Sequence, residues 1–127
     1  MGQQQLLLIV LGVIVVGIAV VVGINLFNAN ATAANRDGVI SDLNNLSAMG
    51  QQYYKKPTSM GGGGNTFTGW SIPTGLDSTA NGTYAVTVTA SSLTIVGTGT
   101  EIGNDGSTEV EATATVTANT ISVAVGN

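Results

Sequence analysis

The sequence contains no cysteine and no histidine, and only 8% of its 127 residues are charged. Without cysteine the chain cannot form a disulfide, a thiolate metal site or a cysteine nucleophile. The three cations, Arg36, Lys55 and Lys56, form no basic patch, and the net charge of −4 argues against a nucleic-acid partner. The six aromatic residues are too scattered for electron transport. We therefore expect neither an enzyme nor a nucleic-acid-binding protein, and no cofactor.

Carboxylates are also scarce, and their positions favour loops and solvent-facing strand residues. Asp105, Glu109 and Glu111 could share a calcium ion, but the spaced Asp/Asn ligands and glycine of a calcium loop are absent. Asn104-Asp105-Gly106 is more typical of a turn, and we expect no metal. The glycine run from Gly61 to Gly64 is not followed by the Lys-Ser/Thr of a phosphate-binding loop, so we expect a flexible linker.

What the sequence does contain is one long apolar run near its N-terminus. Between Leu6 and Ile24 no side chain is polar, and fifteen of the nineteen residues are Leu, Ile or Val. As a helix the run rises about 28 Å, close to the roughly 30 Å hydrocarbon core of a bilayer. β-Branched residues favour strands in water, but in lipid or a dry assembly core the backbone must pair within the segment, so we expect a helix.

Three interpretations fit such a run. A cleaved secretory signal is disfavoured, although Ala31-Thr32-Ala33 offers a cleavage pattern. Residues 1–5 contain no Lys or Arg, and the run exceeds the roughly 7–15 residues of a signal core. A single-pass anchor for an outer domain remains open. The third interpretation is a helix that waits in the membrane and then enters the core of a polymer.

The residues that precede the run favour the polymer. Gln3-Gln4-Gln5 followed by Leu6-Leu7-Leu8-Ile9-Val10 resembles the start of a mature type IV pilin, in which a short lead reaches an acidic fifth residue and a long apolar helix follows. Gln5 stands at the acidic position here. In that family the carboxylate pairs with the N-terminal amine of a neighbouring subunit. Gln5 would instead hydrogen-bond to the amine, without burying an unpaired charge.

The resemblance also implies a processing step and an assembly site. The family's peptidase cuts after a glycine, but a cut after Gly2 would place Leu7 at the fifth position, and we expect none there. Small residues such as Gly12, Gly17 and Ala19 would let helices approach closely. The residues implied in the filament core are Gln3, Gln4, Gln5, Leu6, Leu7, Leu8, Ile9, Val10, Leu11, Gly12, Val13, Ile14, Val15, Val16, Gly17 and Ile18.

An amphipathic pattern follows the apolar run. Its apolar residues recur at steps of three or four, with polar residues mostly between them. They are Val39, Ile40, Leu43, Leu46, Met49 and Tyr53. Lys55 and Lys56 suit a helix C-terminus, and the pattern ends before Pro57. We expect one long helix over residues 1–56, with Gly23 and Gly38 as places where it could bend.

The C-terminal part of the chain switches to a period of two. Residues 84–89, 93–96, 110–117 and 121–125 alternate apolar side chains with Thr, Ala, Ser or Glu, and a glycine-rich loop is expected from Gly97 to Ser107. Two hairpins would make a four-stranded antiparallel meander with one apolar face. The amphipathic stripe is the natural cover for that face. Before the sheet, Phe67, Trp70 and Ile72 are expected to pin a connecting loop.

The predicted fold class is α+β, with three segments. Residues 1–56 form the long helix, with residues 6–24 as a protruding apolar half and an amphipathic half packed on the sheet. Residues 57–82 form the connecting loop, and residues 83–127 form the antiparallel head. This layout resembles that of a pilin.

Three Asn-x-Ser/Thr sequons occur, at Asn30, Asn45 and Asn81, and about two are expected by chance. Asn81, which we place in a turn before a strand, is the most accessible of them. It is our candidate glycosylation site.

The expected function is a structural subunit that polymerises through its N-terminal helix into an extracellular, type IV pilus-like helical filament on the cell surface. The resemblance implies other copies of the chain as partners, together with the inner membrane before assembly and the pilus assembly machinery. Two alternatives remain. One is a single-pass membrane-anchored adhesion or binding module, and the other is a pseudopilin of a secretion or DNA-uptake system.

Overall fold

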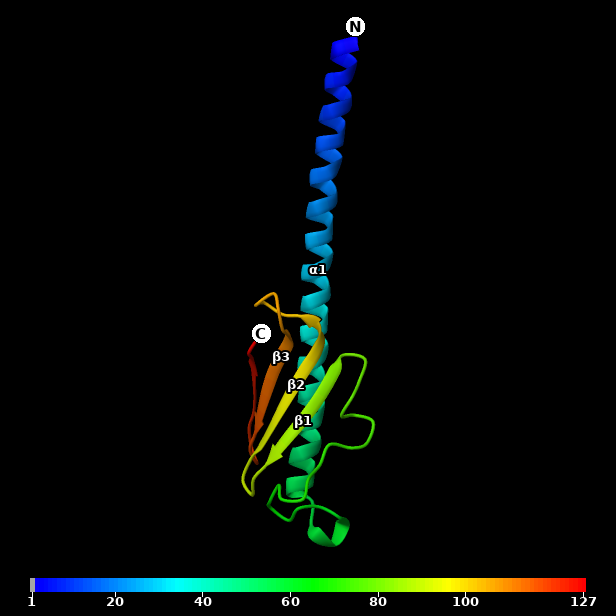
Figure 1. Cartoon of the computed structure of the whole chain (residues 1–127). Helices are drawn as coiled ribbons and strands as arrows, with labels where there is room; N and C mark the ends of the chain where they lie inside the picture. The colour runs from blue at the N-terminus through cyan, green and yellow to red at the C-terminus, as the bar shows by residue number, and fades with distance from the viewer. Residues whose placement is uncertain (1) are drawn as a thin grey trace. The chain divides into compact units, whose positions relative to one another are not determined.

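The computed structural model describes residues 2–127, which form one long helix and one four-stranded sheet (Figure 1). The helix α1 (Gly2–Lys55) is followed by a short 3₁₀ turn, η1 (Thr58–Met60). The strands are β1 (Gly82–Val88), β2 (Leu93–Ile102), β3 (Glu109–Val116) and β4 (Ile121–Val125). The chain divides into two compact units: the described residues up to Ala31, and Thr32–Asn127, which we call the head. The predicted α+β class is confirmed.

The C-terminal end of α1 is capped by the glycine run. The amides of Gly63, Asn65 and Gly64 donate to the carbonyl oxygens of Tyr53, Tyr54 and Lys56, at 2.8, 2.7 and 3.0 Å. These bonds satisfy carbonyl groups that the end of a helix leaves without partners. Gly61 and Gly64 have φ values of 84° and 61°, which glycine adopts without strain. The expectation of a flexible linker is therefore wrong, because the run folds back onto the helix.

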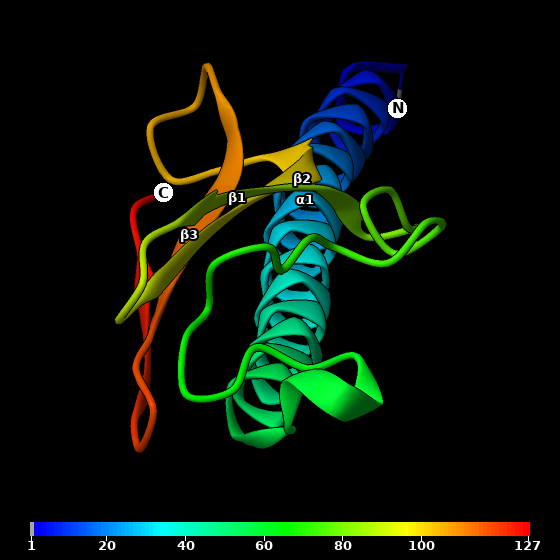
Figure 2. The ribbon, with the colours of Figure 1, turned by 90° about the horizontal axis from the view of Figure 1, so that it is seen from below.

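The sheet has the predicted order, β1-β2-β3-β4, and every neighbouring pair is antiparallel. One face of the sheet lies against the part of α1 that belongs to the head (Figure 2). Val39, Leu43 and Leu46 of that part are at most 2% exposed, and Leu93 and Ile95 of β2 are fully buried opposite the helix layer. Four residues of β3 are fully buried as well: Val110, Ala112, Ala114 and Val116.

Two details of the predicted stripe and loop are refined. Phe67 and Trp70 are buried in the core, and Ile72 packs against it, so the connecting loop is pinned as predicted. Met49, which we expected in the buried stripe, is 37% exposed. Gly50 takes the buried position instead, since a Cβ there would overlap the Cδ1 atom of Leu93.

The predicted loop from Gly97 to Ser107 is wrong in its first half, because β2 continues to Ile102. Gly97 pairs with Tyr84 on one side and Ala112 on the other. A Cβ on Gly97 would lie 2.8 Å from the Cγ1 atom of Val39 and 2.9 Å from the Cε1 atom of Tyr84. Glycine is present there because the helix approaches the strand closely, and not because the chain turns.

Candidate assembly site

The first part of α1 presents an apolar surface on all sides. Within residues 6–24, every Leu, Ile and Val side chain is between 52% and 69% exposed. A helix that is apolar all round is stable only when lipid or protein covers it. The structure places all sixteen predicted core residues, Gln3 to Ile18, on this helix.

Glycine interrupts the apolar surface at three points. A Cβ built on Gly12, Gly17 or Gly23 meets no other atom within 4 Å. These glycines are therefore not required by packing inside one chain. They leave shallow hollows in a helix surface otherwise covered by large side chains, which is the arrangement that allows a second helix to approach closely.

Near the N-terminal end of the same helix, glutamine side chains border the first apolar residues. Gln3 lies beside Leu6, Leu7 and Val10, and the crevice between them is a gap between side chains of one helix. The first turn carries no acidic residue. The helix can thus donate and accept hydrogen bonds at this end through the glutamine amides, without carrying a side-chain charge there.

By length and composition, α1 is the one helix among residues 2–127 that could cross a membrane. Its most apolar window has a mean hydropathy of 3.3, and none of that window is buried within the chain.

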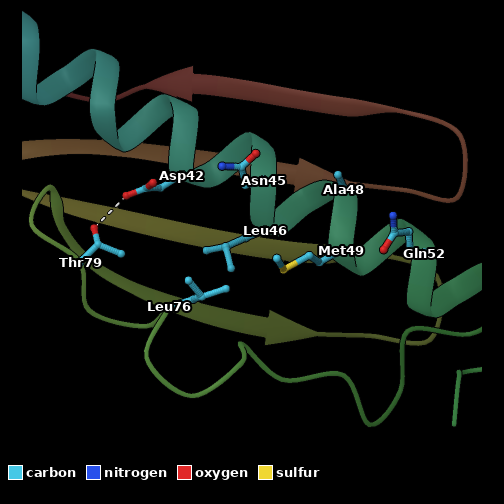
Figure 3. A pocket seen from close by; sticks show the side chains of 8 residues that line it. All are labelled: Asp42, Asn45, Leu46, Ala48, Met49, Gln52, Leu76 and Thr79. Atoms are coloured by element: carbon cyan, nitrogen blue, oxygen red, sulfur yellow. Dashed lines mark hydrogen bonds between the residues drawn. The ribbon is translucent and has the colours of Figure 1, made fainter.

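In the head, sequence reasoning missed a groove of about 320 Å³ beside α1. Figure 3 shows Leu46, Met49 and Leu76 along its floor, with Asp42 and Thr79 at one end. Asp42 accepts three hydrogen bonds on its Oδ2 atom, from Thr79 Oγ1 at 2.8 Å, Asn81 Nδ2 at 3.1 Å and Tyr84 OH at 2.5 Å.

These bonds make Asp42 a structural anchor. Burial raises the pKa of Asp42, but the hydrogen bonds from Tyr84, Asn81 and Thr79 outweigh burial and hold the pKa below its ordinary value of 3.8. The carboxylate ties α1 to β1 and to the residues before it.

No cluster of three or more metal-ligating side chains occurs within residues 2–127.

A second anchor, Asn35, lies about two turns before Asp42 in the helix. Its Nδ2 donates to the carbonyl of Asn81 at 2.7 Å and to Thr100 Oγ1 at 3.3 Å. Its Oδ1 accepts from the backbone amides of Thr100 and Glu101, at 3.0 and 3.2 Å. Only its place opposite the irregular end of β2 shows its role.

The loop that carries Asp105 is the turn that the sequence predicts. Asp105 Oδ1 accepts from the amides of Ser107 and Thr108, at 3.0 and 2.9 Å, and Gly106 has a φ of 75°. The side-chain bond from Thr108 and the two backbone bonds hold the pKa of Asp105 well below its ordinary value. Glu109 and Glu111 are exposed on β3, as predicted.

The candidate glycosylation site, Asn81, is half-buried immediately before β1. Asn30 and Asn45 are exposed, so the expectation that Asn81 is the most accessible of the three sequons is wrong. Its side chain lies against Gly38, where a Cβ would overlap it, and its Nδ2 is the atom that donates to Asp42. A sugar on Nδ2 would have to displace that contact. Modification of Asn81 stays a prediction, with this structural condition attached.

No protein-family model, no curated protein and no solved structure matches this chain.

Proposed function

We propose that this chain is a structural subunit, without catalytic activity, that polymerises into an extracellular, type IV pilus-like helical filament. The observation that carries the proposal is the apolar helix, whose Leu, Ile and Val side chains are all at least 52% exposed between residues 6 and 24. Such a surface requires a cover. A membrane supplies one before assembly, and the same helices of other copies would supply one afterwards.

The sequence from Gln3 to Val10 resembles the start of a pilin. This resemblance supports a polymer, in which helices of other copies surround the apolar helix after assembly. Within this proposal, the hollows at Gly12 and Gly17 let neighbouring helices pack closely. The glutamine amides of Gln3 to Gln5 satisfy polar groups where chain starts meet inside the bundle. The head, which has its own core, forms the outer surface of the filament.

The second candidate function is a single-pass membrane anchor that displays one head for adhesion or binding. The length and hydropathy of α1 favour it equally, because both functions need a membrane-spanning segment. A pseudopilin of a secretion or DNA-uptake system is a variant of the first proposal.

One experiment separates these functions. Cells that express the full chain are sheared, and the released fraction is examined by immunoblotting and negative-stain electron microscopy. The filament proposal expects bulk release of the chain as filaments. If shearing releases no chain and all of it stays in the membrane, the result would support the anchor instead.

Matched variants connect the result to the apolar helix. Val15→Asp puts a charge in a helix surface that must be desolvated, at a cost of about 2.5–3.5 kcal/mol even by insertion measurements, so filaments should be lost. Val15→Leu keeps the surface apolar and should retain them. Normal filaments from Val15→Asp would refute the proposed core.

A further inference from the structure

The sheet of the head is wider than the helix that covers it. Neighbouring strands lie about 4.8 Å apart, so four strands span roughly 14 Å between the outer two, and more with side chains. An α-helix is about 10 Å across with its side chains and covers about two strands. A single helix therefore leaves part of one face of a four-stranded sheet without cover.

Burial along the strands follows this geometry. The inward residues of β2 and β3 are fully buried under α1. On β1, Tyr84 is only 6% exposed. The connecting loop contributes the buried side chains of Phe67 and Trp70 to the core, in addition to those that α1 supplies. At the opposite edge, Gln51 of α1 reaches the turn before β4 and donates from Nε2 to the carbonyls of Thr117 and Thr120, at 3.1 and 3.3 Å. Beyond that turn, Ile121 and Val125 are still 38% and 46% exposed.

The apolar side chains of β4 belong to the core face of the sheet. In the antiparallel register, Ile121 pairs with Val116, Val123 with Ala114 and Val125 with Ala112. Paired residues lie on the same face, and the three partners on β3 are fully buried. We call Ile121, Val123 and Val125 the β4 strip. Val123 packs partly against the core, while the two ends of the strip remain open.

The edge strand β4 is short, at five residues, but it lacks the other features that normally protect a sheet edge. Proteins protect such edges with charged residues, proline, bulges or a covering segment. Residues 117–127 contain no charge and no proline, and the β3–β4 register has no shift. The β1 edge differs, because Ser78 bridges Thr83 and the amide of Tyr84 donates to the Asp77 carbonyl at 2.9 Å. Figure 2 shows β4, in red, at the sheet edge away from α1.

We propose that the β4 strip is the surface on which a second copy of this chain places its apolar helix, residues 6–24. The inference rests on the proposed filament and names the part of the head that contacts the helical core. Within one copy the strip lacks a covering helix, and the helix of residues 6–24 is apolar and exposed on all sides, so a side that neighbouring helices leave open can take the strip. The two requirements are satisfied together when one copy supplies the helix and the next supplies the strip.

The chemistry of the two surfaces fits this contact. Neither carries a charge, so burying them together desolvates no ion. The acidic residues Glu109 and Glu111 lie on the other face of β3, because their neighbours Val110 and Ala112 are the buried ones. A contact between two different surfaces of the same chain is heterologous. Such contacts do not close a dimer, and they propagate into rings or helical filaments.

Photo-crosslinking of assembled full-length chains tests the contact. A benzophenone side chain replaces Val125 in one variant, Ile121 in a second, and the outward-facing Ala124 in the matched control. Each variant is expressed unlabelled and co-assembled with ¹⁵N-labelled chain without the probe. Trypsin then divides the chain into residues 1–36, 37–55 and 56–127, since Lys56 precedes Pro57. Mass spectrometry therefore identifies which segment, of which copy, has been captured.

The proposal expects the probes at positions 121 and 125 to capture the labelled peptide 1–36, with capture at position 124 at least tenfold lower. Capture mainly of the labelled peptide 56–127 would overturn it in favour of edge-to-edge strand pairing. Capture only within one copy, or only of lipid, would overturn it as well. Electron microscopy of the same samples keeps the two proposals apart. Filaments with the wrong crosslink refute this contact alone, whereas the absence of filaments in chain without the probe refutes the proposed function and this contact with it.

Discussion

Tyr84 on β1 donates a 2.5 Å hydrogen bond from its hydroxyl to the Oδ2 atom of Asp42 on α1. The phenol ring is buried in the core, and the carboxylate lies at the border of the groove beside the helix. Burial and the bond to Asp42 both raise the pKa of Tyr84, so the phenol remains a donor at all ordinary pH values. One residue pair thus joins the apolar core of the head to the polar network around Asp42.

Removing the hydroxyl with Tyr84→Phe should destabilise the head by about 1–2 kcal/mol, because a bond to a charged acceptor is lost while the ring still packs. Trp70 is the single tryptophan, and it is 8% exposed in the head, so its fluorescence reports unfolding of the full chain in detergent. Thr87→Val on the outer face of β1 is the matched control. We expect it to change stability by less than about 0.5 kcal/mol.

The head should lose stability in acid. The pKa of Asp42 is lower in the folded head than its ordinary value of 3.8, and the pKa of Asp105 is also lowered. Protonation therefore favours the unfolded state. The stabilisation by these carboxylates is present above about pH 4 and is lost as the pH falls through the folded pKa values.

The measurement is the denaturant concentration at the midpoint of unfolding, determined by Trp70 fluorescence at a series of pH values between 7 and 2. Asp42→Asn should lower the midpoint at pH 7 and flatten its dependence on acid. An Asp42→Asn profile parallel to that of the unchanged chain would contradict the assigned role of this carboxylate.

Asn35→Ala should cost about 1–3 kcal/mol. The truncation leaves the amides of Thr100 and Glu101 and the carbonyl of Asn81 without their partner at a buried position. Asn44→Ala, at an exposed position of the same helix, is the control and should be close to neutral. Hydrogen exchange provides a second measurement, since the Thr100 and Glu101 amides should exchange faster only in Asn35→Ala.

Gly97→Val should destabilise the head by about 1–3 kcal/mol, although valine is the better strand former. Its added side chain meets Val39 and Tyr84, whose atoms already lie within 3.0 Å of a Cβ at this position. Thr98→Val, on the outward side of the same strand, tests whether strand propensity alone decides the result. If Gly97→Val were as stable as Thr98→Val, the close approach of helix and strand would be refuted.

The helix glycines should behave in the opposite way. A Cβ at position 17 meets no side chain and no distant backbone atom of its own chain within 4 Å, and Gly17 lies outside the head, so Gly17→Leu should not lower head stability. Close helix contacts in the proposed filament would be blocked, and the filament yield in the sheared fraction should drop at least tenfold. Ile18→Leu is the control of similar volume. Unchanged yield from Gly17→Leu would exclude Gly17 from the helix contacts.

Sequence periodicity was sufficient to predict the helix and the strands, because it depends only on residues close together in the chain. The run from Leu6 to Ile24 has membrane length, and the steps from Val39 to Tyr53 are those of a helix. The alternation in the last third of the chain placed β1, β3 and β4 within about two residues of their bounds, but it ended β2 at residue 96 and not at Ile102. The errors occurred at glycines. Gly97 was assigned to a loop and Gly61–Gly64 to a linker, because glycine serves turns, caps and close contacts alike.

The sequence by itself determined the α+β class, the apolar helix and the pinned loop, since these depend on the hydrophobicity and spacing of nearby residues. Only the tertiary structure decided that Asp42 and Asn35 anchor the head, because their partners lie 37 to 66 residues away along the chain. It also decided that β4 is left uncovered. The exposure of β4 depends on how the width of one helix compares with the width of a four-stranded sheet, and no single segment of the sequence determines that comparison.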